Sequence, residues 1–257
     1  MENSRPQWIA PDWPAAAHVR ALISTRSGGA SEPPFDSLNL AQHVEDDADQ
    51  VAINRSRLAE AAAMPDHPQW LQQVHGTKLV EADNDGVVRT ADACWSDQPG
   101  VACTVMTADC LPLLVCDREG TRVAAIHAGW RGLAAGIVRD SLEQLQIAPQ
   151  DTLVYLGPAI SQKHFEVGID VLEAFFDSAI DENHGAAVSA AFRPSLQKPM
   201  KYQADLCALA RAELAALGVT EVYGGDYCTF EDSDRFYSYR RDGRTGRMAS
   251  IIWLDPI

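Results

Sequence analysis

A series of short β-rich segments in the first half of the chain most constrains the fold. They are WLQQVH, TKLVEA, VACTVM, LPLLVCD and RVAAIHAG, and turn-forming Gly, Asp and Pro residues separate them. This spacing favours hairpins or a mixed sheet over a regular alternation of strand and helix. Further strands are expected at 21–25 and in TLVYLG, VTEVYG, FYSYRR and ASIIWL.

Helical periodicity appears between these strands. It predicts helices over about 48–63, 131–146, 164–176 and 202–217, with apolar residues recurring on one face in the second and the last. The helix at 131 begins directly after the HAGW turn. We therefore predict an α/β (α+β) fold in one domain, residues 1–257, with a mixed β-sheet and flanking helices.

Charge and composition narrow the function classes. The chain has 257 residues, of which 46% are hydrophobic, and this is the composition of a globular protein. A chain of this length can form a single domain with one hydrophobic core. With 36 acidic and 21 basic residues its net charge is −15, so we expect no nucleic-acid and no membrane partner. A local group of arginines still permits a small anionic substrate. We expect a monomer that acts on a small molecule.

The N-terminal residues MENSRPQWIAPDWPAAAHV lack the basic and apolar regions of a signal peptide, which favours a cytoplasmic location. The six cysteines form no C-x-x-C pair, so they predict neither a disulfide scaffold nor a locally encoded structural zinc site. A reducing compartment fits this pattern.

Three residues with metal-binding side chains lie at or near predicted strand ends: His75 in QVHG, Cys110 in TADC and His127 in IHAGW. A thiolate and two imidazoles suit Zn²⁺ and leave a fourth position for water or substrate, as in catalytic zinc sites. The gaps between them are long, so spacing alone does not demonstrate that they meet. Taken singly, Cys110 also fits a buried packing role, and each histidine fits a structural one.

Cys110 is also a candidate nucleophile. In that interpretation His127 acts as the base, and Asp109 or Glu166 orients the imidazole. A zinc-bound thiolate is a poorer nucleophile, so the two interpretations compete. Under both, Asp109 is a candidate for orienting a histidine or transferring a proton.

Arginines supply candidates for an anion site, because guanidinium groups bind phosphate through two parallel hydrogen bonds. Arg26 in STRSGG, Arg131 at a helix start, and Arg240 with Arg241 in YSYRRDGRTGR are the candidates. Ordinary surface ion pairs are the alternative. The chain has no P-loop and no Gly-x-Gly-x-x-Gly motif, so a nucleotide cofactor held in those ways is not supported.

These motifs together resemble a known family. In order, TRSGGASEPPFDSLNL, LQQVHGTKLV, ADAC, TADCLPLLV, AAIHAGWRGLAAG, LGPAIS, FEVGIDV, KYQADLCALA and FYSYRRDGRTGR are similar to the YfiH family. That family is also known as peptidoglycan editing factors or laccase-like polyphenol oxidoreductases. The similarity runs over nearly the whole chain, and TADC with HAGWRGL is highly specific.

The resemblance implies a YfiH-like fold with zinc held by His75, Cys110 and His127, and a copper ion is a second possibility. It also implies a purine nucleoside enzyme that phosphorolyses adenosine, inosine and methylthioadenosine and deaminates adenosine. Deamination would use Asp109 or Glu166 for proton transfer. Phosphorolysis would use Arg26, Arg131 and Arg241 to bind phosphate, and Glu166 is a further candidate for binding the substrate.

The resemblance leaves other functions open. One is editing of peptidoglycan precursors by a cysteine-type amidase in which Cys110 is the nucleophile. Another is copper-dependent oxidation of polyphenols, although the seven histidines are few for a multicopper oxidase. A third is a non-enzymatic binding module with a structural metal, which the open fourth position disfavours.

Overall fold

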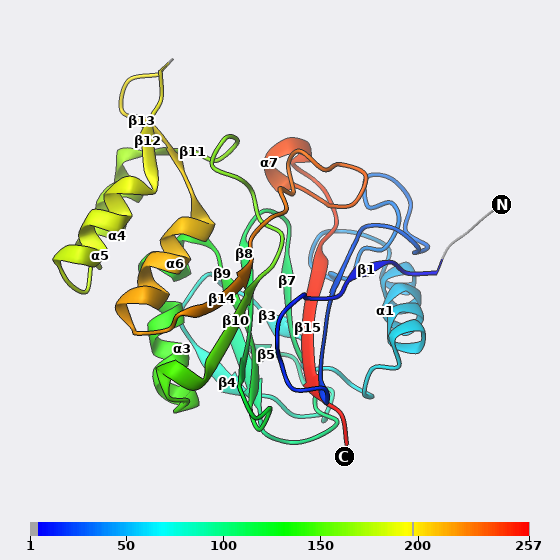
Figure 1. Cartoon of the computed structure of the whole chain (residues 1–257). Helices are drawn as coiled ribbons and strands as arrows, with labels where there is room; N and C mark the ends of the chain where they lie inside the picture. The colour runs from blue at the N-terminus through cyan, green and yellow to red at the C-terminus, as the bar shows by residue number, and fades with distance from the viewer. Residues whose placement is uncertain (1–4, 197, 257) are drawn as a thin grey trace.

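The computed structural model describes residues 5–196 and 198–256. Two sheets form its centre (Figure 1). The first has the order β1 (Trp8–Ile9), β2 (Val19–Ser24), β15 (Met248–Leu254), β7 (Cys103–Thr107). The second has the order β14 (Glu221–Gly224), β10 (Thr152–Leu156), β8 (Leu111–Asp117), β9 (Val123–Ala128), β6 (Ala93–Ser96), β4 (Leu79–Glu81).

Strand directions in the second sheet are mixed. β10 pairs with β14 in parallel and with β8 antiparallel, and β8 and β9 form an antiparallel hairpin. The predicted mixed sheet is therefore confirmed. Two small sheets complete the strands: β11 (Glu166–Gly168), β13 (Lys201–Ala204) and β12 (Phe192–Pro194) form one, and β3 (Leu71–Gln72) and β5 (Arg89–Thr90) form the other.

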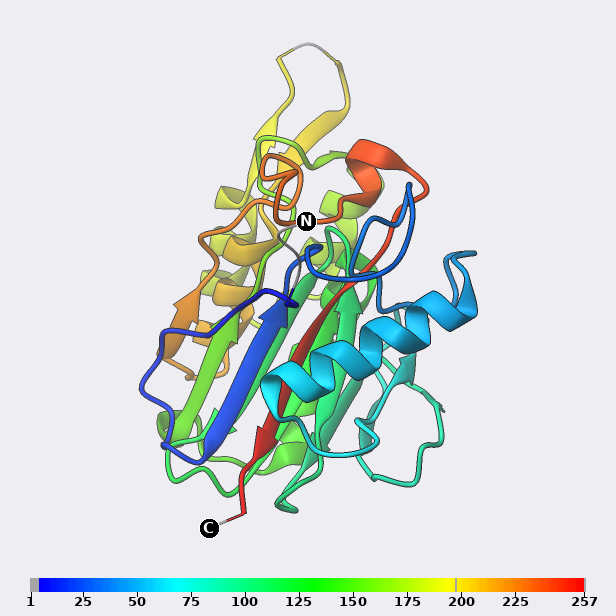
Figure 2. The same cartoon turned by 90° about the vertical axis from the view of Figure 1, so that its right-hand side faces the viewer.

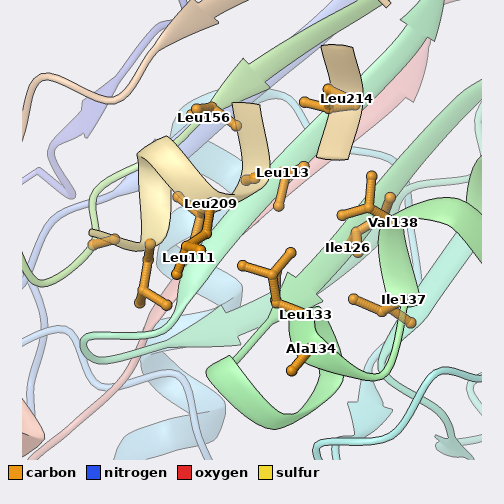
Figure 3. Packing of buried hydrophobic residues seen from close by; sticks show 14 of the residues in the cluster. Leu111, Leu113, Ile126, Leu133, Ala134, Ile137, Val138, Leu156, Leu209 and Leu214 are labelled. Atoms are coloured by element: carbon orange, nitrogen blue, oxygen red, sulfur yellow. The ribbon is translucent and has the colours of Figure 1, made fainter. Parts of the chain in front are cut away.

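The side chains of β8 point alternately to two buried faces, which explains why its sequence is an unbroken apolar run. Leu111, Leu113 and Val115 face the helices, whereas Leu114 and Cys116 pack into the cluster that contains β2 and β15 residues. A strand buried on both faces has no polar face, so alternation of polar and apolar residues disappears. Figure 3 shows Leu111, Leu113 and Ile126 of the sheet against Leu133, Ile137 and Leu209 of the helices.

Helices cover the outer faces of the two sheets. α1 (Ala48–Ala62) crosses the outer face of the first sheet (Figure 2), where Leu58 packs with Leu22 and Ile251. The outer face of the second sheet is covered by α2 (Trp130–Ala134), α3 (Ile137–Leu145) and α6 (Leu206–Ala216). The remaining helices are α4 (Ile169–Asp177), α5 (Glu182–Ala190) and α7 (Tyr239–Asp242), and a 3₁₀ turn spans Pro149–Asp151.

Several predicted helix limits were wrong. The helix expected over 131–146 is divided into α2 and α3, because Gly136 has a left-handed φ of 91° and caps α3. The segments 166–168 and 201–204 are strands that precede α4 and α6, not parts of those helices. The predicted strand FYSYRR was also wrong, since Ser238 caps the short helix α7 there. No helix in the described part of the chain has the length and hydropathy needed to cross a bilayer.

A buried carboxyl group on α6 makes a prediction about stability. Glu213 is 5% exposed, and burial raises its pKa from 4.5 to about 7, although the backbone N–H of Arg139 donates a 3.3 Å bond to it. Its contribution to stability is fully present below pH 4.5 and is lost as the pH rises through 7. The difference between these two pKa values corresponds to roughly 3 kcal/mol of unfolding free energy. Glu213→Gln should therefore flatten the decline in unfolding free energy between pH 5 and pH 8.

Urea unfolding of the wild type and Glu213→Gln at both pH values measures this effect. The exposed Glu143 on α3 provides the control Glu143→Gln, which should follow the wild type. Equal pH dependence for all three proteins would show that Glu213 does not titrate in this way.

Candidate metal centre

His75, Cys110 and His127 meet at one end of the central sheets. Their ligand atoms all lie within 4.8 Å of one another. Cys110 is in the turn between β7 and β8, His127 is in β9 opposite Pro112, and His75 follows β3. The β8–β9 hairpin therefore brings Cys110 and His127 together despite the residues between them.

A carboxylate that the sequence analysis did not include, Asp92, holds two of these residues. It is fully buried, and His127 Nδ1 lies 2.9 Å from its Oδ1. Backbone N–H groups of Val74, His75 and Gly76 donate to the two carboxylate oxygens at 3.2, 2.8 and 2.7 Å. Because Nδ1 of His127 is engaged, Nε2 is free to face Cys110.

The electrostatics of the cluster favour a thiolate. Burial raises the pKa of the Cys110 thiol, but His127 and His75 outweigh burial and lower that pKa to about 6. Burial alone would lower the pKa of His127. The neighbouring Cys110 and Asp92 have a larger combined effect and raise this pKa to about 9. Burial also opposes ionisation of Asp92, yet bonds from His127 and Gly76 bring the pKa of Asp92 below its usual value. A thiolate is the form that binds metals and the form that acts as a nucleophile.

The residues fit a zinc ion. Cys110 Sγ and His75 Nε2 are 3.9 Å apart, and two such ligands of a tetrahedral zinc ion lie roughly 3.6 Å apart. Gly129 leaves space beside them, because a Cβ there would lie 3.2 Å from Cys110 Sγ and 2.7 Å from His75 Cδ2. His127 has the carboxylate partner typical of metal-binding histidines. Sulfur and nitrogen ligands also suit copper, so the donor set does not choose between the two metals.

Gly129→Ala should weaken metal binding about tenfold or more while leaving the unfolding temperature nearly unchanged. The new methyl group would push the exposed ring of His75 away from its position, whereas the core would lose no contact. Zinc affinity measured by competition with a chelating dye checks this. In the control Gly185→Ala, the Cβ meets only Ala179 at 3.8 Å, so zinc affinity should not change. Unchanged affinity in Gly129→Ala would contradict the proposed arrangement of ligands.

Asp109 is positioned by other parts of the chain. It is 8% exposed and has a left-handed φ of 91°. Thr229 Oγ1 donates to its Oδ1 and the backbone N–H of Arg240 donates to its Oδ2, both at 2.6 Å. A strained backbone conformation that is held by two strong bonds is common at functional sites. Its role in proton transfer stays a prediction.

Glu166, the other carboxylate proposed to orient His127, is engaged elsewhere. Lys198 Nζ lies 2.7 Å from its Oε1 on the exposed side of β11. The residue that orients His127 is Asp92, and the expectation that Asp109 or Glu166 does so was wrong. The backbone carbonyl of Glu166 accepts a bond from Arg240. Binding of substrate by Glu166 stays a prediction.

The predicted anion-binding arginines make structural contacts. Arg26 donates to the carbonyls of Asp36 and Ser233, and Arg241 donates to those of Thr229, Phe230 and Phe236. Arg131, exposed on α2, stacks over Trp130 with its Cζ 4.3 Å from the ring centre. The anion site built from these residues stays a prediction.

Arg247 is a cation that the sequence analysis missed. Burial lowers the pKa of its guanidinium, while Cys110, Asp109 and Tyr239 are close enough to oppose this shift. Its Nη1 donates to the carbonyls of Thr245 and Gly246, and it forms no ion pair within residues 5–196 and 198–256. Asp92 and Arg247 lack a distinguishing spacing in sequence. The signals available for Asp92 were a lone carboxylate directly before an apolar strand and its place in the ADAC motif.

The chain is similar to known proteins over nearly its whole length. Residues 20–255 match the family model described as multi-copper polyphenol oxidoreductase laccase. A Pseudomonas aeruginosa protein named purine nucleoside phosphorylase is 56% identical over 96% of this chain and 98% of its own length. The Escherichia coli purine nucleoside phosphorylase YfiH is 49% identical over the same shares of the two chains.

Solved structures show the same fold. A Neisseria meningitidis protein superposes with a TM-score of 0.90 at 47% identity, covering 97% of this chain and 99% of that one. YlmD from Geobacillus stearothermophilus superposes with a TM-score of 0.87 at 32% identity, covering 99% of this chain and all of the other. The similarity extends over the whole arrangement of sheets that brings His75, Cys110 and His127 together. The chain therefore belongs to the YfiH family, whose model is described as multi-copper polyphenol oxidoreductase laccase.

Proposed function

We propose that this protein is a metal-dependent purine nucleoside phosphorylase that accepts adenosine, inosine and methylthioadenosine and also deaminates adenosine. The names of relatives with 49 to 56% identity support the nucleoside phosphorylase class. The observation that carries the metal dependence is the cluster of His75, Cys110 and His127, whose donors lie within 4.8 Å of one another. Three protein ligands leave one position open to water or substrate.

In phosphorolysis, a phosphate oxygen forms a bond to the anomeric carbon of ribose as the bond from that carbon to the purine breaks. The electron pair leaves with the purine, which takes up one proton. We propose that Arg247 binds the phosphate, because its cationic side chain is within electrostatic range of Cys110 and Asp109 and forms no ion pair in the described part of the chain. Arg26, Arg131 and Arg241 remain the candidates from the sequence.

His75, Cys110 and His127 would hold the metal, and we propose Zn²⁺ because the family resemblance of the sequence implies it and the donors are compatible with it. When bound, the ion would supply Lewis-acid stabilisation of negative charge in the substrate. Asp92 would keep His127 oriented with Nε2 toward the site. Copper remains an alternative because the family model is described as a copper oxidoreductase.

A second function, a cysteine-type hydrolase that edits peptidoglycan precursors, is favoured by one observation. Cys110, His127 and Asp92 are arranged in series, with the pKa of Cys110 lowered to about 6 by its neighbours against the effect of burial. This is the order of groups in thiol hydrolases. The Cys110 thiolate would attack an amide carbon, and His127 would protonate the departing amine. Water would then hydrolyse the thioester, which releases the acid and restores the thiol.

One set of incubations separates these functions. Protein of measured zinc and copper content is incubated with adenosine, with and without phosphate, and separately with a serine-containing muramyl nucleotide. Products are then identified by mass spectrometry. Phosphate-dependent release of adenine and ribose 1-phosphate is the expected result, and inosine indicates deamination. Serine release without any change in adenosine would refute the phosphorylase and support the hydrolase.

A further inference from the structure

A second group of metal-binding side chains lies outside the centre described above. It consists of His164, Cys228 and Glu231, whose ligand atoms also lie within 4.8 Å of one another. His164 is in the loop between β10 and β11, while Cys228 and Glu231 are in the chain between β14 and α7. His164 and Cys228 are partly exposed and Glu231 is exposed, so solvent ions can reach all three.

The backbone fixes this group in place. The N–H of Ala159 donates to the carbonyl of Tyr227, and the N–H of Thr229 donates to that of Ala159, at 3.3 and 3.0 Å. These bonds form a short parallel bridge between Ala159 and Cys228. The two loops run beside each other above the sheets in Figure 1. The donors are therefore close together before any ion arrives, which reduces the entropy cost of binding one.

The side chains are also oriented by their neighbours. The ring of His164 stacks on Phe230, with ring centres 4.2 Å apart and planes 15° apart. Its Nε2 lies 3.0 Å from Glu231 Oε1. Cys228 Sγ lies 3.1 Å from Ser161 Oγ. Imidazole nitrogen, sulfur and carboxylate oxygen thus point to a common region.

Lys163 competes for the same carboxylate. Its Nζ lies 2.6 Å from Glu231 Oε1, but the Lys163 side chain is 74% exposed. Exposed ion pairs of this kind contribute little to stability, and a divalent ion bound by a thiolate contributes far more. Lys163 can therefore leave Glu231 for solvent at little cost.

We propose that His164, Cys228 and Glu231 form a second site for a divalent ion of the zinc type, separate from His75, Cys110 and His127. Binding releases the Cys228 proton to solvent and leaves the fourth position of the ion to water. This proposal does not depend on the reaction that the protein catalyses.

The second site would join the two loops that support Asp109. The loop of His164 donates the N–H of Ile160 to the Asp109 carbonyl at 2.9 Å. The segment of Cys228 donates the Thr229 hydroxyl to the Asp109 carboxylate at 2.6 Å. An ion that links the loops therefore restrains both hydrogen-bond donors to Asp109, the neighbour of Cys110.

Counting bound zinc tests the proposal. The full-length protein is saturated with Zn²⁺, dialysed against metal-free buffer and assayed by elemental analysis. We expect two zinc ions per wild-type chain, one in Cys228→Ser, one in Cys110→Ser and none in the double variant. The control variant Cys207→Ser, which alters another partly exposed cysteine, should still bind two zinc ions. One ion in the wild type that is lost in Cys110→Ser, or two ions in Cys228→Ser, overturns the second site.

His164→Gln provides a second route to the same answer if Cys228→Ser fails to fold. It should also bind one ion, and two ions in this variant would overturn the proposal. Cobalt provides a check on the ligand type, because a thiolate bound to Co²⁺ gives a near-ultraviolet charge-transfer band. Cys228→Ser should lose about half of the wild-type band, and the full band would contradict ligation by Cys228. The Cys110→Ser count tests the first centre independently, so failure of one site is distinguishable from failure of the other.

Discussion

Cys110→Ser is expected to abolish metal binding at the centre of His75, Cys110 and His127 and to reduce nucleoside phosphorolysis about a thousand-fold. A serine hydroxyl keeps the size of the cysteine but stays protonated, so it does not replace a thiolate ligand. Loss of a Lewis acid removes several kcal/mol of stabilisation of the transition state, and about 4 kcal/mol corresponds to this factor. Zinc content and kcat/KM for adenosine with phosphate are the measurements.

The control for this prediction is Cys207→Ser, which lies on α6 away from the ligands and should keep both properties. A Cys110→Ser protein that binds zinc normally and remains fully active would contradict both the metal interpretation and the nucleophile interpretation of Cys110. Retained zinc with lost activity would instead favour Cys110 as a nucleophile.

Asp92→Asn should reduce zinc affinity by about 10- to 100-fold and also destabilise the fold by about 1–3 kcal/mol. The carboxylate receives backbone N–H groups on both oxygens and His127 Nδ1 on one. An asparagine has one oxygen and one NH₂ group, so its NH₂ must face a hydrogen-bond donor. His127 then loses its fixed orientation or a buried N–H loses its acceptor.

Zinc competition titrations and urea unfolding of the metal-free protein separate the two effects of Asp92→Asn. Asp97→Asn, a change at an exposed position five residues later, should alter neither. If Asp92→Asn binds zinc as tightly as the wild type, Asp92 does not position the ligands.

The sequence predicted the strands of the central sheets better than the helices beside them. Runs such as LPLLVCD and RVAAIHAG are buried on both faces, and their apolar character marked β8 and β9 directly. Helix limits failed where a local signal competed with apolar periodicity. Gly136 begins α3 and so divides a continuous periodic stretch into two helices. Lys201–Ala204 pairs with β11 and β12 although its residues continue the pattern of α6.

The residues that meet at the candidate centre were predictable from the sequence, whereas the residue that supports them was not. His75, Cys110 and His127 have side chains whose chemistry identifies them in isolation, and each lies at or near a strand end. Asp92 acts through contacts with backbone groups near residue 75 and with His127, which only the folded chain brings within reach. His164 has no comparable signal in the sequence, because its neighbours Phe230 and Glu231 are distant along the chain.

The buried carboxylate of Asp92 has a consequence for how the protein acquires its metal. Because one side chain fixes both the backbone of His75 and the imidazole of His127, the arrangement of ligands persists when the ion leaves. Exchange of one ion for another then needs no refolding of the chain. The identity of a metal bound at this centre would then be governed by ligand chemistry and by the supply of ions around the protein, rather than by the moment of folding.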